Sequence, residues 1–167
     1  MIIASQMGHV EVVKLLIEYK VNGDLAANDG FTPLYIASQE GHIEVLKLLL
    51  AYKVNGDLAM NDGTTPLIAS SCNGHVEAVK LLLEYKVNGD LATNDGATAL
   101  FLASGFGSIE MVKLLMEYKV NGDLATIDGT TPLFIVSQMG HVEVAKLIKS
   151  MAIWQQMMVT LLCILLV

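Results

Sequence analysis

Residues 29–61 read DGFTPLYIASQEGHIEVLKLLLAYKVNGDLAMN, and this stretch repeats along the chain. Its opening Asp-Gly pair recurs at a constant step of 33 residues, at Asp29-Gly30, Asp62-Gly63, Asp95-Gly96 and Asp128-Gly129. A second glycine column keeps the same step, at Gly8, Gly41, Gly74, Gly107 and Gly140. A fixed period of this length is typical of repeat proteins, whose units stack side by side. The repeat therefore organises almost the whole chain.

The first half of a unit predicts a tight turn followed by a short helix. In the quoted unit the Asp-Gly pair is a turn signal, because glycine readily takes the left-handed conformation that a tight hairpin needs. Thr32 suits the N-cap of a helix, and Pro33 suits its first position, where a backbone N–H is not needed. The helix is expected over residues 33–40 and ends at Gly41 in the left-handed conformation.

The second half of a unit predicts a longer helix over residues 42–52. Its apolar residues recur at three- and four-residue spacing, which places them on one face: Ile43, Val45, Leu46, Leu49 and Leu50. Glu44 and Lys47 have the spacing of an ion pair on the opposite, solvent-facing side. One such helix pair is too small to bury its apolar face alone, so the units must stack into a continuous core.

These residues resemble the ankyrin repeat. The family's pattern is matched by Gly30, Thr32-Pro33-Leu34, Ala37-Ser38, Gly41-His42 and Leu48-Leu49-Leu50. The resemblance implies an all-α solenoid of stacked helix-turn-helix repeats joined by short hairpin-type loops. It covers residues 1–148, divided into unit one (1–28, partial), unit two (29–61), unit three (62–94), unit four (95–127) and unit five (128–148, partial). Residues 149–167 form an apolar C-terminal tail.

Single columns depart from the family's pattern. Unit four has Ala99 in place of proline and Ser108 in place of histidine. Lys53-Val54-Asn55 stands where the family has Gly-Ala-Asp, so the left-handed residue after the second helix is expected to move to Asn55 or Gly56. The histidine that often follows Thr-Pro-Leu is replaced at Tyr35, Ile68, Phe101 and Phe134. This stripe starts a packed helix, so packing between repeats is the favoured interpretation, and an extension of a binding groove is the alternative.

The composition narrows the classes of function. The chain has 167 residues, is 53% hydrophobic and carries a net charge of −7, with ten lysines and no arginine. A chain this apolar is not intrinsically disordered. An acidic chain without arginine does not fit a nucleic-acid surface, where positive charge supplies most of the affinity. Two cysteines (Cys72 and Cys163), no glycosylation sequon and no basic leader favour a cytoplasmic or other reducing intracellular compartment.

Residue types that suggest catalysis are explained by the repeat. The histidines occupy one column of different units, and stacked helices lie about 8–10 Å apart, too far to share a zinc ion with bonds of about 2 Å. Each histidine is instead expected to bridge backbone groups between repeats: His9, His42, His75 and His141. The eight aspartates fall in the hairpins and fit turn chemistry better than a calcium loop. No enzyme activity, metal or cofactor is expected.

Exposed columns that differ between units are the candidates for partner recognition, because constant columns are explained by the fold. By resemblance to ankyrin repeats, the hairpin tips and the ends of the first helices line a concave groove that binds other proteins. The candidates at the tips are Ala27, Asn28, Phe31, Met60, Asn61, Thr64, Thr93, Asn94, Ala97, Thr126, Ile127 and Thr130. Those at the helix ends are Gln39, Glu40, Cys72, Asn73, Gly105, Phe106, Gln138 and Met139. The prediction is a non-catalytic scaffold for a protein partner.

Two features describe the expected partner. Apolar side chains at positions expected to be exposed make good interface anchors. They are Phe31, Met60, Phe106 and Met139. All eight aspartates lie in the hairpin segments, whereas all ten lysines lie in the second helices or at their ends. The hairpin edge is therefore expected to be acidic and to favour a partner with a basic surface, and no nucleic-acid partner is expected.

Both ends of the repeat array lack the polar outer face that a terminal repeat needs. Unit one begins in its first helix, without a hairpin or a Thr-Pro cap. The stretch 151–167 carries no charge, and three interpretations stay open: an apolar helix covering unit five, a membrane anchor at the lower length limit of a span, or foreign or truncated sequence. A membrane contact is expected only through this stretch. The alternative function is a fragment of a larger ankyrin-repeat protein, tethered through the tail, whose activity resides elsewhere.

Overall fold

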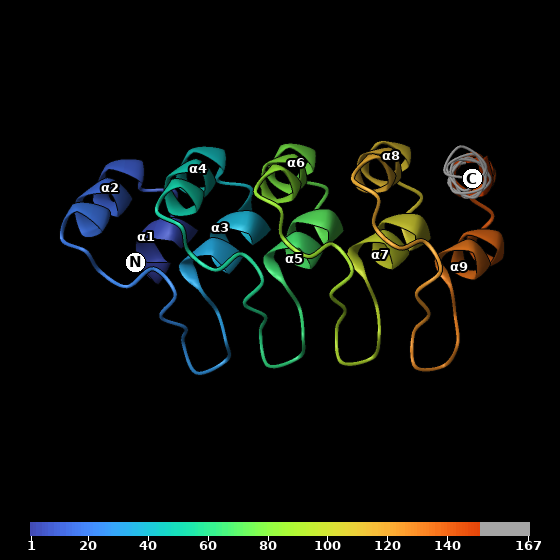
Figure 1. The fold of residues 1–167 in the computed structure, drawn as a ribbon, viewed down its shortest axis with the longest axis horizontal. Helices are drawn as coiled ribbons and strands as arrows, with labels where there is room; N and C mark the ends of the chain where they lie inside the picture. The colour runs from blue at the N-terminus through green and yellow to red at the C-terminus, as the bar shows by residue number, and fades with distance from the viewer. Residues whose placement is uncertain (151–167) are drawn as a thin grey trace, which may run out of the picture.

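The computed structural model describes residues 1–150, and over this range the chain is a row of paired helices (Figure 1). The first helices of the five units are α1 (Ile2–Gln6), α3 (Pro33–Glu40), α5 (Pro66–Cys72), α7 (Ala99–Gly105) and α9 (Pro132–Met139). The second helices are α2 (Val10–Glu18), α4 (Ile43–Ala51), α6 (Val76–Glu84) and α8 (Ile109–Glu117), and residues 142–150 are helical in unit five. Each unit thus contributes one helix to each of two rows.

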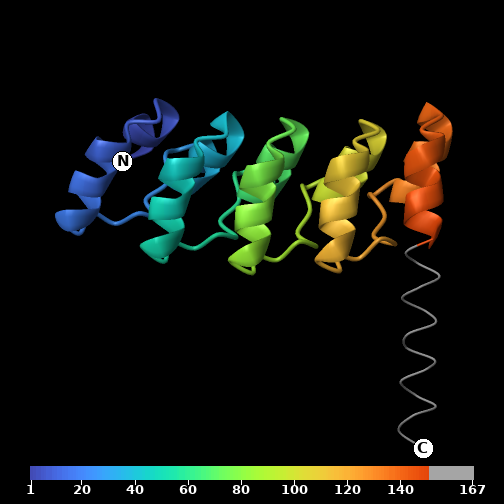
Figure 2. The same cartoon turned by 90° about the horizontal axis from the view of Figure 1, so that it is seen from above.

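The two rows of helices form two layers, and hairpins extend from one side of them. Each first helix packs on the first helix of the next unit, and α2, α4, α6 and α8 pack in the same order. Figure 1 shows the hairpins projecting in one direction, and Figure 2 shows the units side by side along one axis. Within the described part of the chain the only strand-type pairing is an isolated bridge between Ala92 and Thr98. The predicted all-α solenoid is confirmed.

The first helices begin and end as the sequence predicts. The Thr32 Oγ1 accepts a hydrogen bond from the backbone N of Tyr35 at 3.0 Å, and Pro33 occupies the first helical position. The same cap recurs at Thr65, Thr98 and Thr131. Helix α7 is capped in this way although it has no proline, so the threonine hydroxyl is the N-cap that these four helices share. Gly41 ends α3 in the predicted left-handed conformation, with φ 71°.

The second helix of unit two, predicted over residues 42–52, is α4, with His42 and Tyr52 as its flanking caps. The Lys47 Nζ lies 2.8 Å from the Glu44 Oε1, so the predicted ion pair forms on the exposed side. Equivalent pairs form in α2 and in residues 142–150. The amphipathic interpretation of this helix is therefore confirmed.

The left-handed residue after α2, α4, α6 and α8 is a lysine, and the prediction of Asn55 or Gly56 is wrong. Lys53 has φ 63°, and the equivalent lysines share this conformation: Lys20 at 56°, Lys86 at 66° and Lys119 at 61°. The lysine takes the place of the family's glycine, so the turn keeps its position and changes its residue. A side chain in this region costs about 1–2 kcal/mol. Helix-end hydrogen bonds such as that from the Lys53 N to the Leu50 O, at 3.0 Å, hold the turn in place.

Apolar side chains of both layers make one continuous core. A single cluster of buried side chains runs from Ala4 in α1 to Ile148 in unit five. Leucines on the inner face of the second helices, such as Leu49, Leu82 and Leu115, are fully buried. No unit encloses these side chains alone, so stacking supplies the burial that makes each helix pair stable.

The stripe at the start of the first helices packs in some units and not in others. Tyr35 and Ile68 are buried, Phe101 is half-buried and Phe134 is exposed. The rings of Tyr35 and Phe31 meet edge to face, with centroids 5.4 Å apart. Burial, with smaller contributions from Asp62 and Cys72, raises the pKa of the Tyr35 hydroxyl. Packing between repeats, the favoured interpretation, is therefore confirmed for units two and three, and Phe134 departs from it.

Three of the four histidines bridge neighbouring units, as predicted, and the prediction is wrong for His9, whose ring is exposed and bonds no other unit within the described residues. Each ring Nε2 donates to a backbone carbonyl of the preceding unit: His42 to Gln6 at 2.9 Å, His75 to Gln39 at 2.9 Å and His141 to Gly105 at 3.0 Å. These bonds join the start of a second helix to the end of the preceding unit's first helix. Unit four has Ser108 in this column, and its Oγ accepts from the backbone N of Met111 at 3.4 Å instead. The junction between α5 and α7 therefore has no ring bridge.

Candidate protein-binding surface

Each hairpin tip is a short turn closed by two backbone hydrogen bonds. In the tip before α3, the Ala27 N donates to the Phe31 O at 3.0 Å, and the Gly30 N donates to the Ala27 O at 2.9 Å. Gly30 has φ 89°, a conformation that glycine adopts without a steric penalty. The same two bonds recur in the tips formed by residues 60–64, 93–97 and 126–130. The tip side chains are thus presented on a fixed backbone.

Neighbouring tips are joined to one another by hydrogen bonds. The backbone N of one tip donates to a carbonyl of the tip before it: Asn61 to Asp29 at 3.3 Å, Asn94 to Asp62 at 2.8 Å and Ile127 to Asp95 at 2.9 Å. Two asparagine side chains add a second bond, since the Asn61 Nδ2 donates to the Asn28 O and the Asn94 Nδ2 donates to the Asn61 O. The tips therefore form one row, and these two amides contribute to the row itself.

The aspartates at the hairpin bases bind the next unit, a role that the sequence reasoning missed. The Asp24 Oδ1 accepts from the backbone N of Asn55 at 2.8 Å. The equivalent bonds join Asp57 to Asn88 at 2.8 Å and Asp90 to Asn121 at 2.6 Å. The constant 33-residue repetition of both aspartate and asparagine was the available signal, because a constant polar pair suits a bond between units.

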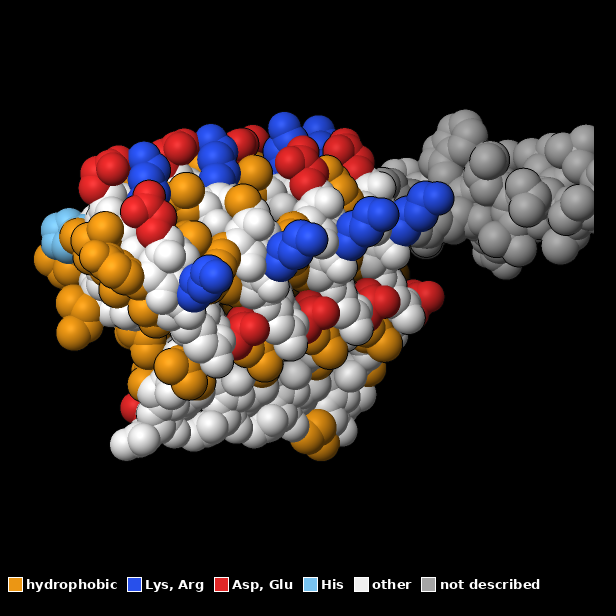
Figure 3. Space-filling view, turned by 60° about the vertical axis from the view of Figure 1, so that its left-hand side comes forward, with side chains coloured by type: hydrophobic (Ala, Val, Ile, Leu, Met, Phe, Trp, Pro, Cys, Tyr) orange, Lys and Arg blue, Asp and Glu red, His pale blue; other side chains and the backbone are white. Residues whose placement is uncertain are grey.

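The tip aspartates Asp62 and Asp128 accept hydrogen bonds from neighbouring threonines in the turn, as predicted. The Thr64 backbone N donates to the Asp62 carboxylate at 2.8 Å, and this bond with the Thr64 side chain holds the pKa of Asp62 below its usual value. Thr126 and Thr130 lower the pKa of Asp128 in the same way. Figure 3 shows a row of acidic side chains on the hairpin side of a parallel row of basic ones. Negative charge near the hairpins is thus bordered by the lysines of the second layer.

The structure places most of the predicted contact residues at the surface. The exposed ones are Ala27, Asn28, Glu40, Asn61, Cys72, Asn73, Asn94, Phe106, Ile127, Gln138 and Met139. The half-buried ones are Phe31, Gln39, Met60, Thr64, Thr93, Gly105, Thr126 and Thr130. All of them belong to the hairpins or to the ends of first helices, which form the surface considered below.

Three residues are less accessible than the sequence predicts. Ala97 is buried, so its expected exposure is wrong, because its small side chain lies on the return of a hairpin that closes onto Thr93. Phe31 and Met60 were expected to be exposed anchors but are half-buried. They pack against a small apolar cluster that contains Tyr35. Contacts within the hairpin and packing against the small apolar cluster explain these differences, and the sequence pattern alone does not reveal them.

Among the predicted contact residues, the large apolar side chains that are exposed all lie in units four and five. Phe106 and Met139 occupy equivalent positions at the ends of α7 and α9, and both are largely exposed, at 64% and 57%. Ile127 is exposed at a hairpin tip of the same region. Leu133 and Phe134 in α9 are also exposed and were not among the predicted contacts. The Leu133 column is buried in units two to four, which is why no exposure was expected there, whereas Phe134 belongs to the stripe for which an extension of the binding groove was the alternative interpretation.

The described residues offer little that resembles a catalytic centre. Burial raises the pKa of the Cys72 thiol, which keeps it protonated near neutral pH and a poor nucleophile. Within residues 1–150 no three His, Cys, Asp or Glu side chains converge as metal ligands. The predictions of a capping helix or a membrane anchor at 151–167 concern residues outside the described part of the chain.

Comparison with known proteins agrees with the geometry. A family model described as ankyrin repeats (3 copies) matches residues 1–62, 52–125 and 87–157. A search of curated proteins finds no match. Ankyrin repeats are in general non-catalytic modules that bind other proteins, and the stacked helix pairs with projecting hairpins have this architecture. The chain belongs to the ankyrin-repeat family.

Proposed function

We propose that the protein is a non-catalytic scaffold that binds a partner protein through its hairpin tips and first-helix ends. The observation that carries this proposal is the exposure of Phe106 and Met139 at equivalent positions of neighbouring units. Exposed apolar side chains on a fixed backbone suit binding, because little order has to be gained when the partner arrives. The hydrogen-bonded row of tips supports the same conclusion.

The partner's contact surface is proposed to combine apolar and basic groups. Apolar groups of the partner would cover Phe106 and Met139, because removing these large exposed side chains from water is favourable. Basic groups would face the tip carboxylates, of which Asp62 and Asp128 are held in the charged form. Charges at the rim of an interface mainly raise the association rate and set specificity.

The test is affinity capture with a paired variant and a matched control. Changing Phe106 and Met139 together to Ser removes apolar area at the proposed surface, and a tenfold or greater loss of the partner is expected. Ile109 and Tyr118 are exposed apolar residues of the second layer in unit four, so changing them to Ser is the control. The control variant retains the partner. Retention of every wild-type partner by the first variant contradicts the proposed surface.

A second candidate is a scaffold tethered to a membrane, and it rests on the uncharged sequence of residues 151–167. No helix within residues 1–150 has the length and hydropathy needed to cross a bilayer. Carbonate extraction of membranes from expressing cells tests the tether. Release into the soluble fraction excludes an anchor, and retention in the membrane pellet supports one.

A further inference from the structure

Unit two covers the start of its own first helix with apolar side chains from the hairpins. Phe31 and Met60 pack against the small apolar cluster that contains Tyr35 and Ile36. The rings of Phe31 and Tyr35 meet edge to face, with centroids 5.4 Å apart. As a result Tyr35 is 5% exposed and Ile36 is 7% exposed. The chain itself thus shows an aromatic side chain seated over this position.

Unit four has small residues in place of these covering side chains. The two covering residues are here Ala97 and Thr126, and the two residues beneath them are Phe101 and Leu102. Ala97 is itself buried, and its methyl group is too short to extend over a phenyl ring as Phe31 does. Phe101 and Leu102 accordingly remain half-buried. The aromatic ring of unit four therefore keeps accessible surface that the ring of unit two has lost.

A glycine leaves the same stretch of α7 uncovered on its other side. Gly105 lies one helical turn after Phe101, where unit two has Gln39 and unit five has Gln138. Its φ is not positive, so the backbone does not require a glycine there. A Cβ added to Gly105 would lie 3.4 Å from the Ile135 Cγ1, an ordinary contact, and would meet nothing closer among the described residues. We call the surface formed by Phe101, Leu102 and Gly105, with Ala97 at its hairpin edge, the unit-four patch.

Carboxylates border the unit-four patch. Asp95 is exposed on the same hairpin tip as Ala97. Asp128 lies on the next tip, where hydrogen bonds from Thr126 and the following turn residue hold its pKa below the usual value. The ion pairs among residues 1–150 lie within the second helices, so no described lysine neutralises these tips. A basic group of a partner would therefore find complementary charge beside the patch.

We infer that unit four binds an aromatic side chain of the partner protein, seated over Phe101 between Ala97 and Gly105, with a basic residue of the partner beside it at Asp95. The ring pair of unit two is the chain's own example of this contact. Aromatic pairs of this kind add to the burial of the rings, and aromatic side chains are frequent anchors of protein interfaces. The inference rests on the proposed function and names the anchor that the partner would supply.

Selection of short random peptides displayed on phage, with the whole chain as the target, tests the inference. The selected peptides are expected to share an aromatic residue next to a lysine or arginine. One of them, labelled with a fluorophore, is the probe, and fluorescence anisotropy measures its dissociation constant. Replacing its aromatic residue with alanine is expected to weaken binding at least tenfold. A selection that yields no peptide, or peptides without an aromatic residue, overturns the inference.

Two substitutions fill the unit-four patch with the chain's own side chains. Gly105→Gln restores the residue of units two and five, Ala97→Phe restores the ring of unit two, and each is expected to weaken the probe at least tenfold. Ala97→Phe should also raise the melting temperature, because its ring covers Phe101 without a partner. Cys72→Gln is the matched control in unit three, where the residue beneath is Ile68, only 1% exposed, and it should leave the affinity unchanged. Circular dichroism checks that the helices are kept, and Gly105→Gln decides alone if Ala97→Phe is unfolded, because glutamine favours a helix more than glycine does.

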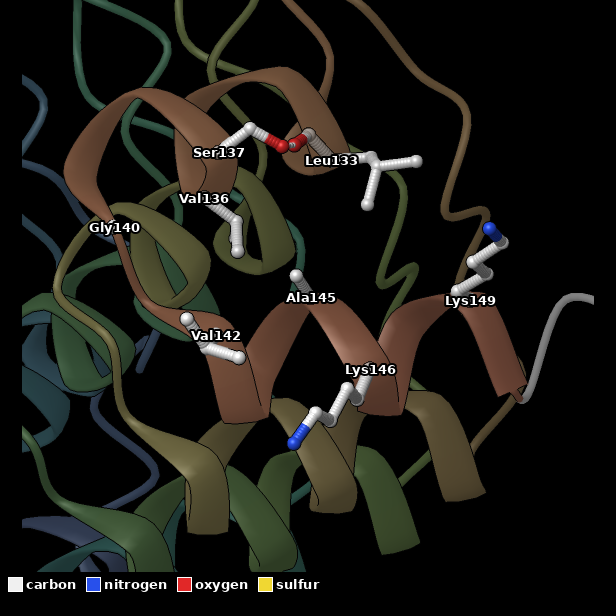
Figure 4. A pocket seen from close by; sticks show the side chains of 8 residues that line it. All are labelled: Leu133, Val136, Ser137, Gly140, Val142, Ala145, Lys146 and Lys149. Carbon is white, nitrogen blue, oxygen red and sulfur yellow. Dashed lines mark hydrogen bonds between the residues drawn. The ribbon is translucent and has the colours of Figure 1, made fainter.

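A further control examines apolar surface outside the patch. Val142 is exposed and lines a cavity of about 450 Å³ between α9 and residues 142–150 (Figure 4). Val142→Ser is expected to leave the affinity for the probe unchanged. Full binding by Gly105→Gln, or an equal loss in Cys72→Gln or Val142→Ser, overturns the inference. If the pair of Phe106 and Met139 changes abolishes partner capture while Gly105→Gln retains both partner and probe, this inference fails and the proposed function stands.

Discussion

The junction between α3 and α5 and the junction between α5 and α7 join units of almost the same sequence, yet they are bridged differently. In the first, the His75 ring lies beside Gly41 and bonds the Gln39 carbonyl at 2.9 Å. In the second, Ser108 replaces the histidine, and no described atom approaches within 4 Å of the point where a Cβ on Gly74 would stand. The second junction therefore holds without a ring bridge.

Two other contacts persist at both junctions and explain why the solenoid continues. The hairpins remain joined across the second junction, since the Asn94 N donates to the Asp62 O and the Asn88 N donates to the Asp57 carboxylate, both at 2.8 Å. The apolar core also continues without a break. The comparison shows that apolar packing and the hydrogen bonds between hairpins hold the units together. The histidine ring adds a further bond where it is present.

The largest effect is expected from the core. Leu82→Ala removes a fully buried side chain of α6 and should lower the free energy of unfolding by about 2–5 kcal/mol, through lost apolar burial and a new cavity. Urea unfolding followed by circular dichroism measures it. A loss smaller than that caused by removing a ring bridge would show that packing is not the main term.

A smaller loss is expected when the first junction is made to resemble the second. His75→Ser removes the bond to Gln39 and the ring beside Gly41, which should cost about 1–2 kcal/mol. His9→Ser, at dilute concentration, is the matched control because His9 is exposed, and a change within about 0.5 kcal/mol is expected there. Equal losses for the two variants would contradict the role given to the ring.

The reverse change should strengthen the second junction. Ser108→His introduces a ring that has space beside Gly74 and a carbonyl at Cys72 in the position equivalent to Gln39. The free energy of unfolding is expected to rise by about 0.5–1.5 kcal/mol. One hydrogen bond is added, and only the 3.4 Å bond from the Met111 N to the Ser108 Oγ is lost. Amide hydrogen exchange in α7 measures the gain locally. Faster exchange than in the wild type would show that the ring does not fit.

The elements that the sequence predicted correctly depend on local signals that every unit repeats. Thr32 and Pro33 mark the start of α3, and Gly41 marks its end, because capping needs only neighbours in the chain. The left-handed turn at Lys53 was missed, because intrinsic preference favours glycine or asparagine and the helix-end bonds override it. Local sequence therefore locates the helices more reliably than the residue that must absorb backbone strain.

Exposure at the candidate surface was harder to predict than the fold, because it depends on which side chains folding brings into contact. Ala97 is buried by a hairpin return, and Phe31 is half-buried by its contact with Tyr35. Leu133 and Phe134 are exposed in unit five, whereas their equivalents in unit two, Leu34 and Tyr35, are buried. The position of a residue within the repeat therefore predicts where it lies, and contacts made on folding decide how much of its side chain remains exposed.

Relieving the backbone strain of the lysine turn after α6, close to the second junction, should raise the free energy of unfolding. Lys86→Gly at the end of α6 replaces a left-handed lysine with a residue that adopts φ 66° freely, and should stabilise the chain by about 0.5–1 kcal/mol. Lys80→Gly in the middle of the same helix is the control and should destabilise by about 1 kcal/mol. Thermal unfolding compares the two. Destabilisation by both would show that the Lys86 side chain makes a contact worth more than its strain.

The smallest expected effect is a pH dependence in the hairpin that crosses the second junction. The Thr64 backbone N bonds the Asp62 carboxylate and lowers its pKa below the usual value of 3.8. A carboxyl whose pKa is lower in the folded chain stabilises the fold above its unfolded pKa, and this contribution is lost as the pH falls through the folded pKa. Because Asp62 is exposed, solvent screens the effect and keeps it small.

Asp62→Asn should therefore reduce the fall in melting temperature on acidification below about pH 4, since the amide cannot titrate. Thermal unfolding of the variant and the wild type at closely spaced pH values measures the difference. The Asn94 backbone amide donates to the Asp62 carbonyl, so its hydrogen exchange reports how protonation of the Asp62 carboxylate affects the bond between hairpins. If the variant keeps the full wild-type slope, or the Asn94 amide does not respond to pH, the tip carboxylate is not coupled to the bond between hairpins, and packing alone would carry the junction in acid.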